Sequence, residues 1–221
     1  MTNDQHIRQS SLALLSPRGF RVASSLPLSG GGFDTLRPVE EIAARTLAIK
    51  ALFAFVAAPE KQVPSAALSP YFSFLTDEER TIVTLDRARA RDEWVDIIGW
   101  KLENLWPLCW VLGFEPEPTI EASQISNDVQ SALLFDFTPN FDLSPREWLN
   151  FLSPRADEEV ARLEDLFYCA HNAVRSAQLG GQTVPEGFHP VLHGGAVHER
   201  RHALTWCLSP GVAWDDTDLS T

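Results

Sequence analysis

Cysteines, basic side chains and long apolar runs are all scarce in this chain of 221 residues. The three cysteines, Cys109, Cys169 and Cys207, lie far apart in apolar surroundings. That pattern is typical of buried thiols in a reducing compartment, and it excludes a framework of disulfides. None of the three has the exposed, electropositive setting that a reactive thiolate needs.

Membrane insertion and secretion find no support in the sequence. No apolar run reaches the ~20 residues that span a bilayer. The N-terminus lacks a basic region, and residues 12–15 are too few to form the core of a signal peptide. We therefore expect a soluble, cytoplasmic protein.

Positive charge is also in short supply, with 18 Lys and Arg against 30 Asp and Glu and a net charge of −12. An acidic surface disfavours nucleic acid and anionic membranes as partners, and it attracts basic proteins. Solubility alone is another explanation of the charge. The glycines after Ser29 lack the lysine of a phosphate-binding loop, and no nucleophile elbow is present. We expect no cofactor.

Apolar residues at helical spacing, together with capping signals, predict a mainly α fold without βαβ units. Residues 1–35 carry weak signals, and we expect them to form an irregular arm with at most one short hairpin. Residues 36–221 are predicted to form one α-helical domain, a multi-helix bundle. The charged run 86–93 is expected to be a solvated connection. The predicted helices cover residues 38–58, 76–85, 94–113, 123–134, 144–152, 153–180 and 196–208. Glu40 and Glu41 fall in the first turn of the helix 38–58, Thr76 and Glu79 form a capping box at the start of the helix 76–85, and Ser144 caps the helix 144–152.

The helix predicted at residues 94–113 is apolar on every side, which is typical of a buried helix. Glu103 falls on the same side as Trp106 and Trp110. Pro107 removes the hydrogen bond to the carbonyl of Glu103, which predicts a kink there. A buried carboxylate in this position needs a cationic or hydrogen-bonding partner.

Two arginines fall within apolar helix faces, Arg45 in the helix 38–58 and Arg200 in the helix 196–208. Arg45 could pack its stem and extend its head to water, or it could pair with a buried carboxylate such as Glu103. Arg200 presents a planar set of donors, with Glu103, Glu164, Asp215 and Asp216 as candidate acceptors. Arg45, Glu103 and Arg200 would then form either a structural ion network or the lining of a polar pocket.

Residues 198–202, His-Glu-Arg-Arg-His, match the zincin pattern of two histidines one helical turn apart. His198 and His202 would be the metal ligands and Glu199 the general base. The two central arginines, the lack of a later glutamate and the position of both histidines opposite the apolar stripe argue against this interpretation. Metal binding by the histidine-rich stretch 189–202 therefore stays an alternative.

Two long motifs resemble a bacterial family known as domain of unknown function 4272. Residues 99–113 read Gly-Trp-Lys-Leu-Glu-Asn-Leu-Trp-Pro-Leu-Cys-Trp-Val-Leu-Gly, and residues 197–206 read Val-His-Glu-Arg-Arg-His-Ala-Leu-Thr-Trp. The chain departs from the family pattern at Cys169 and Asn172, where an Arg and a Trp are expected. The resemblance implies an α-helical domain, without a known activity. The residues at motif positions are Arg45, Glu103, Glu199, Arg200, Trp206, Trp214 and Asp215.

These observations favour a non-enzymatic module that binds another protein, with a basic partner suggested by the charge. An immunity-type partner of a toxin is one concrete form of that role. The alternatives are a zinc-dependent hydrolase that uses His198, Glu199 and His202, and a small-ligand protein with a polar pocket at Glu103, Arg45 and Arg200.

Overall fold

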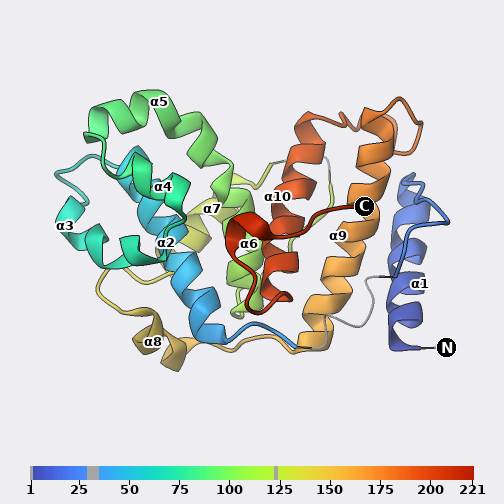
Figure 1. Cartoon of the computed structure of the whole chain (residues 1–221), viewed down its shortest axis with the longest axis horizontal. Helices are drawn as coiled ribbons and strands as arrows, with labels where there is room; N and C mark the ends of the chain where they lie inside the picture. The colour runs from blue at the N-terminus through green and yellow to red at the C-terminus, as the bar shows by residue number, and fades with distance from the viewer. Residues whose placement is uncertain (1, 29–34, 122–123) are drawn as a thin grey trace. The chain divides into compact units, whose positions relative to one another are not determined.

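The computed structural model describes residues 2–28, 35–121 and 124–221, and these residues form ten α-helices and no strand (Figure 1). The prediction of a mainly α fold is confirmed. The glycine loop after Ser29 and the predicted start of a helix at residue 123 lie outside the described residues. The helices pack into two compact units. Unit 1 comprises Met1–Arg37, Pro118–Gln124 and Arg155–Thr221, and unit 2 comprises Pro38–Glu117 and Ile125–Pro154.

Unit 1 is built on three helices, α1 (Asn3–Leu15), α9 (Asp157–Gln178) and α10 (Leu192–Cys207). Helix α9 packs against α10 on one side and against α1 on the other, as Figure 1 shows. Because it has neighbours on both sides, α9 buries polar side chains as well as its apolar stripe. Its Leu163 and Phe167 are fully buried.

Helix α1 corrects the prediction of an irregular arm for residues 3–15. Thr2 and Gln5 form a capping box that opens the helix. Its buried residues are Arg8, Ser11 and Leu15, which recur at helical spacing. Two of these three residues are polar, so the buried face does not appear in the sequence as apolar residues repeating at helical spacing. For that reason hydrophobic patterning missed this helix.

The other helices of unit 1 differ from prediction at their starts. Helix α9 begins at Asp157 rather than at residue 153, because the carboxylate of Glu159 accepts a hydrogen bond from the backbone N–H of Ala156 and caps the helix there. Helix α10 begins at Leu192 rather than at residue 196. Residue 194 of this helix is a glycine because a Cβ atom at this position would lie only 2.6 Å from Cγ1 of Val174 on α9.

Unit 2 surrounds helix α2 (Val39–Ala57), which has acidic residues in its first turn as predicted. The helices α5 (Arg87–Gly99), α6 (Lys101–Val111) and α8 (Pro145–Trp148) pack against it. The capping box predicted at Thr76 and Glu79 is present, and Ser144 is the N-cap of α8 as predicted. The remaining helices are α3 (Ser65–Leu68), α4 (Asp77–Ile82) and α7 (Asn127–Ser131), which continues as a π-helical turn over Ala132–Phe137.

The helix predicted at residues 94–113 is interrupted at Trp100, between α5 and α6. The N–H of Trp100 donates to the carbonyl of Ile97 at 3.2 Å, a tightened final turn next to the weak helix former Gly99. Pro107, where the sequence predicts a kink, lies inside α6. The charged run 86–93 is not a loose connection, because Asp86 caps α5 and the run forms its first turns.

Candidate functional site

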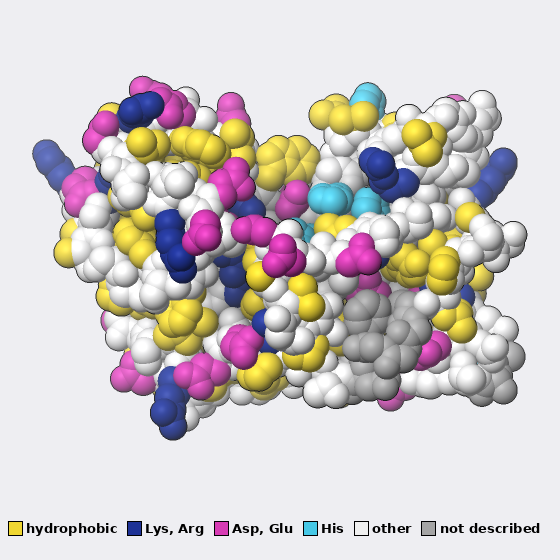
Figure 2. All heavy atoms as spheres, in the orientation of Figure 1, with side chains coloured by type: hydrophobic (Ala, Val, Ile, Leu, Met, Phe, Trp, Pro, Cys, Tyr) yellow, Lys and Arg dark blue, Asp and Glu magenta, His cyan; other side chains and the backbone are white. Residues whose placement is uncertain are grey.

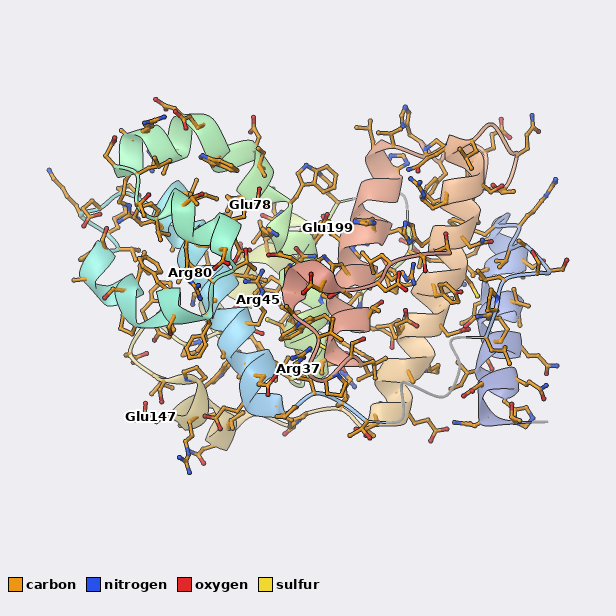
Figure 3. All side chains as sticks on the ribbon, in the orientation of Figure 1. Arg37, Arg45, Glu78, Arg80, Glu147 and Glu199 are labelled. Atoms are coloured by element: carbon orange, nitrogen blue, oxygen red, sulfur yellow. The ribbon has the colours of Figure 1, made fainter. Side chains whose placement is uncertain are left out.

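Arg45 pairs with Glu79, the residue predicted as the second member of the capping box of α4. Its Nη1 and Nη2 donate to the two oxygens of Glu79 at 2.6 and 2.7 Å, and both side chains are 4% exposed. Figure 3 shows Arg45 extending from α2. Nζ of Lys101 lies 3.5 Å from Oε1 of Glu79, and Oε2 also accepts from the N–H of Thr76. Glu79 therefore caps α4 and neutralises a buried arginine.

Burial acts to raise the pKa of Glu79, but the hydrogen bonds and charge of Arg45, the charge of Lys101 and the Thr76 N–H outweigh it. The net result is a pKa lowered to about 2. The carboxylate therefore stays ionised under all ordinary conditions. Such a group stabilises its neighbours and is unsuited to proton transfer near neutral pH.

Glu103, the acid expected in the central helix, is buried on α6. Its Oε1 accepts from the backbone N–H of Ile125 at 2.8 Å, which fixes the start of the segment leading into α7. On the neighbouring turn, Nε1 of Trp106 donates to the carbonyl of Pro116 at 2.8 Å. Both side chains thus hold loops of unit 2 in place.

In unit 1, Arg200 is fully buried, and its Nη1 donates to the carbonyl of Thr119 at 2.6 Å. Trp206 and Trp214 form an aromatic pair with ring centroids 5.2 Å apart, and the guanidinium of Arg37 lies 4.0 Å from the Trp206 ring. Of the other motif positions, Glu199 is half-buried on α10 (Figure 3), whereas Asp215 is exposed.

The two histidines of the zincin-like motif, His198 and His202, contact different residues. The His198 ring packs edge-on against His171, with centroids 5.2 Å apart. Nε2 of His202 lies 2.9 Å from the carbonyl oxygen of Trp214. Within residues 2–28, 35–121 and 124–221, no group of three or more His, Cys, Asp or Glu side chains has the geometry to hold a metal ion.

A buried polar cluster that the sequence did not predict lies in unit 1, along α9. Arg201 of α10 donates to Glu164 at 3.4 Å and to Nδ1 of His171 at 2.8 Å, and it also holds the carbonyls of Leu219 and Ser220. On the α1 side, Arg8 pairs with Asp165 at 2.8 Å. The ring of Tyr168 contacts both guanidiniums, with its centroid 4.6 Å from that of Arg201 and 5.4 Å from that of Arg8.

Burial shifts the pKa values of His171, Glu164 and Tyr168 in this cluster. Burial, reinforced by the positive charge of Arg201, lowers the pKa of His171 to about 3, so its imidazole is neutral and Nδ1 accepts from Arg201. Burial raises the pKa of Glu164, against the opposing effect of Arg201. The side chains contact one another and the C-terminal segment, so the cluster has the character of a structural network.

The candidate ligand site is an apolar cavity of about 590 Å³ in unit 2, which we call the α2 pocket. Its walls are the C-terminal half of α2, the segment 58–64, Ala67 of α3, and residues 134–135 and 140–142. Phe135 lies at this cavity with 73% of its surface exposed. The few polar groups in the lining include Lys50, Gln62 and Asp142.

Lys50 is a buried residue of the α2 pocket. Its Nζ donates to the carbonyls of Thr138 at 3.1 Å and Pro139 at 2.8 Å, and it lies 5.1 Å from the centroid of the Phe141 ring. Burial lowers the pKa of Lys50 to about 8, although the negative charge of Asp142 acts in the opposite direction. The lysine is therefore mostly an ammonium at neutral pH.

Arg87 fixes one wall of the α2 pocket. From the start of α5 its guanidinium donates to the carbonyls of Ala54 at 2.7 Å and Ala58 at 3.0 Å, and also to that of Val63. These bonds add to the backbone hydrogen bond that the carbonyl of Ala54 already accepts from the N–H of Ala58 at the C-terminal end of α2. They tie the segment 58–64 to the helix, so the pocket is held open by directed bonds.

Among the described residues, no helix has the length and apolar character needed to cross a membrane.

Comparison with known proteins identifies a family but no characterised relative. No curated protein and no solved structure matches the chain. A family model described as a domain of unknown function, DUF4272, matches residues 7–217. Because that match takes in nearly the whole chain, the protein belongs to the DUF4272 family.

Proposed function

We propose that the protein binds a small apolar molecule in the α2 pocket. The observation that carries the proposal is the size and lining of the cavity. Its volume of about 590 Å³ falls within the range of about 300–1,000 Å³ typical of small-ligand sites. The lining is mainly apolar, with a few polar groups that can orient a ligand.

Water in such a cavity gains few hydrogen bonds from the walls. Phe53, Ala54 and Ala57 of α2 and Leu134 and Phe135 of the facing segment offer it no polar partner. Displacing that water with an apolar chain removes hydrocarbon surface from water, which favours binding by roughly 25 cal/mol per Å². This pocket differs from the polar pocket expected at Glu103, Arg45 and Arg200, because its walls are apolar and its cation is Lys50.

The test is binding of 1-octanol, a neutral apolar probe, measured by isothermal titration calorimetry. We expect saturable binding, and we expect Ala57→Phe to weaken it at least tenfold because the ring fills the cavity. Ala88→Phe, the same substitution on the exposed face of α5, is the matched control and should bind like the wild type. If neither 1-octanol nor other octyl compounds bind, or if Ala57→Phe leaves their affinity intact, the proposal fails.

Binding of a basic protein is a second candidate, supported by an apolar surface at one end of unit 1. Leu179, Val191 and Leu192 are 85%, 65% and 60% exposed. Nε2 of Gln178 donates to the carbonyl of Pro190, which brings the end of α9 to the start of α10. Exposed apolar groups that cluster in this way are common at protein interfaces, and the net charge of −12 complements a basic partner. An immunity-type role toward a toxin is one form of such binding.

We expect Leu192→Asp to abolish recovery of a basic partner in a pull-down from the native host. Leu28→Asp, at another exposed leucine of unit 1, should leave recovery unchanged. High salt should reduce recovery with the wild type, because the acidic charge contributes to the attraction. Capture of no stoichiometric protein, or equal capture by Leu192→Asp, would count against this candidate. On the face that Figure 2 draws, acidic side chains occur on both units with neutral and apolar side chains among them, so the apolar surface would have to set specificity.

A further inference from the structure

Lys50 gives the α2 pocket a chemical preference. Building on the proposed function, we infer that the pocket selects an apolar chain that ends in a carboxylate, with one carboxylate oxygen accepting a hydrogen bond from Nζ of Lys50. The proposed function requires only an apolar ligand. The inference adds the class of ligand and the residue that recognises it.

The number of N–H donors on Nζ of Lys50 supports a carboxylate as the end group of the ligand. A lysine ammonium has three N–H donors. The carbonyls of Thr138 and Pro139 accept two of them. Among the residues that the structure describes, none accepts a hydrogen bond from the third, and the ring of Phe141 lies beside the ammonium. A buried cation with a remaining donor gains most from an anionic oxygen, because charge-assisted hydrogen bonds are about twice as strong as neutral ones.

The surrounding charges favour a single negative charge on the ligand. Asp142 is exposed and also lines the pocket, so it would repel a dianionic phosphate more strongly than a monoanionic carboxylate. A phosphate also needs several donors, and the pocket offers one lysine without an arginine in its lining. A cationic ligand would meet the like charge of Lys50 in a desolvated setting, which is unfavourable.

The extent of the pocket along α2 sets the length of the hydrocarbon chain that the ligand can have. The pocket follows the helix from Lys50 to Ala58, a rise of about 12 Å at 1.5 Å per residue. An extended hydrocarbon chain of about 8 to 10 carbon atoms has a similar length, since each C–C bond is about 1.5 Å long. With its carboxylate at Lys50, such a chain would lie against Phe53, Ala54 and Ala57 and end near the segment held by Arg87.

The experiment compares three probes with one chain length and different ends: octanoate, 1-octanol and octylamine, titrated by calorimetry at pH 7. We expect octanoate to bind the wild type at least tenfold more tightly than 1-octanol, and octylamine to bind most weakly. In Lys50→Met, which keeps an unbranched apolar side chain, the difference between octanoate and 1-octanol should disappear. Circular dichroism and the melting temperature establish that the variant is folded.

The possible outcomes separate the two proposals. If 1-octanol binds as tightly as octanoate, the inference is overturned while the proposed function stands. The same holds if folded Lys50→Met keeps the preference for octanoate. If no octyl compound binds, both proposals fail. Should Lys50→Met not fold, the ranking of the three probes on the wild type still decides the inference.

Discussion

Replacing Glu79 by glutamine is expected to lower the free energy of unfolding by about 3 kcal/mol, because it removes the acid that neutralises Arg45 and Lys101. Leaving one member of a buried ion pair without its counter-charge typically costs about 3–5 kcal/mol. The pKa of Glu79 gives an independent figure. A pKa lowered from 4.5 to about 2 corresponds to about 3 kcal/mol at neutral pH.

Glutamine is the informative replacement, since it preserves the rest of the local structure. A glutamine at this position can still accept from the N–H of Thr76, so the capping box of α4 is retained. The matched control is Glu78→Gln, one residue earlier in the same first turn but exposed (Figure 3). Urea unfolding followed by circular dichroism should show a change of about 0.5 kcal/mol or less for the control.

The pH dependence provides a second measurement. Because the folded pKa of Glu79 lies below its unfolded value, the stabilisation is complete above pH 4.5 and is lost as the pH falls toward about 2. The difference in unfolding free energy between wild type and Glu79→Gln should therefore shrink over that window. A difference below about 1 kcal/mol at pH 7 would show that the Arg45–Glu79 pair contributes little.

Local signals in the sequence predicted much of the fold. Capping residues such as Thr76 and Ser144 located the starts of helices, because they satisfy donors that any helix leaves open. Apolar periodicity located α2, α6, α9 and α10. It failed for α1, whose buried face contains Arg8 and Ser11. It also missed the interruption at Trp100, where an apolar run continues through a change of direction.

The candidate site was less accessible to sequence analysis. The burial of Arg200 followed from its place in an apolar stripe, but Glu79 was hidden by its capping role. The α2 pocket joins segments 50–67 and 134–142, which lie far apart in the sequence, and no local pattern reports their proximity. The acceptors of Lys50, the carbonyls of Thr138 and Pro139, lie 88 and 89 residues away in the sequence, so no local pattern indicates its role.

The buried histidine of unit 1 should make the protein sensitive to mild acid. We expect the wild type to lose about 2 kcal/mol of unfolding free energy between pH 6.5 and pH 5, relative to His171→Gln. The folded pKa of His171 is about 3, so only the unfolded chain takes up a proton over this range. Stability therefore falls as the pH decreases below about 6.5. Glutamine keeps an acceptor for Arg201 but cannot titrate.

Comparing the slopes of stability against pH isolates His171 from its neighbours. Glu164, Arg201, Arg175 and His198 are present in both proteins, so their own contributions largely cancel in the difference. His6→Gln, at an exposed position of α1, is the matched control and should retain the slope of the wild type. If His171→Gln loses stability as steeply as the wild type, His171 is already protonated in the folded state. Its Nδ1 could not then accept from Arg201, and the hydrogen bonding of the cluster would have to be reassigned.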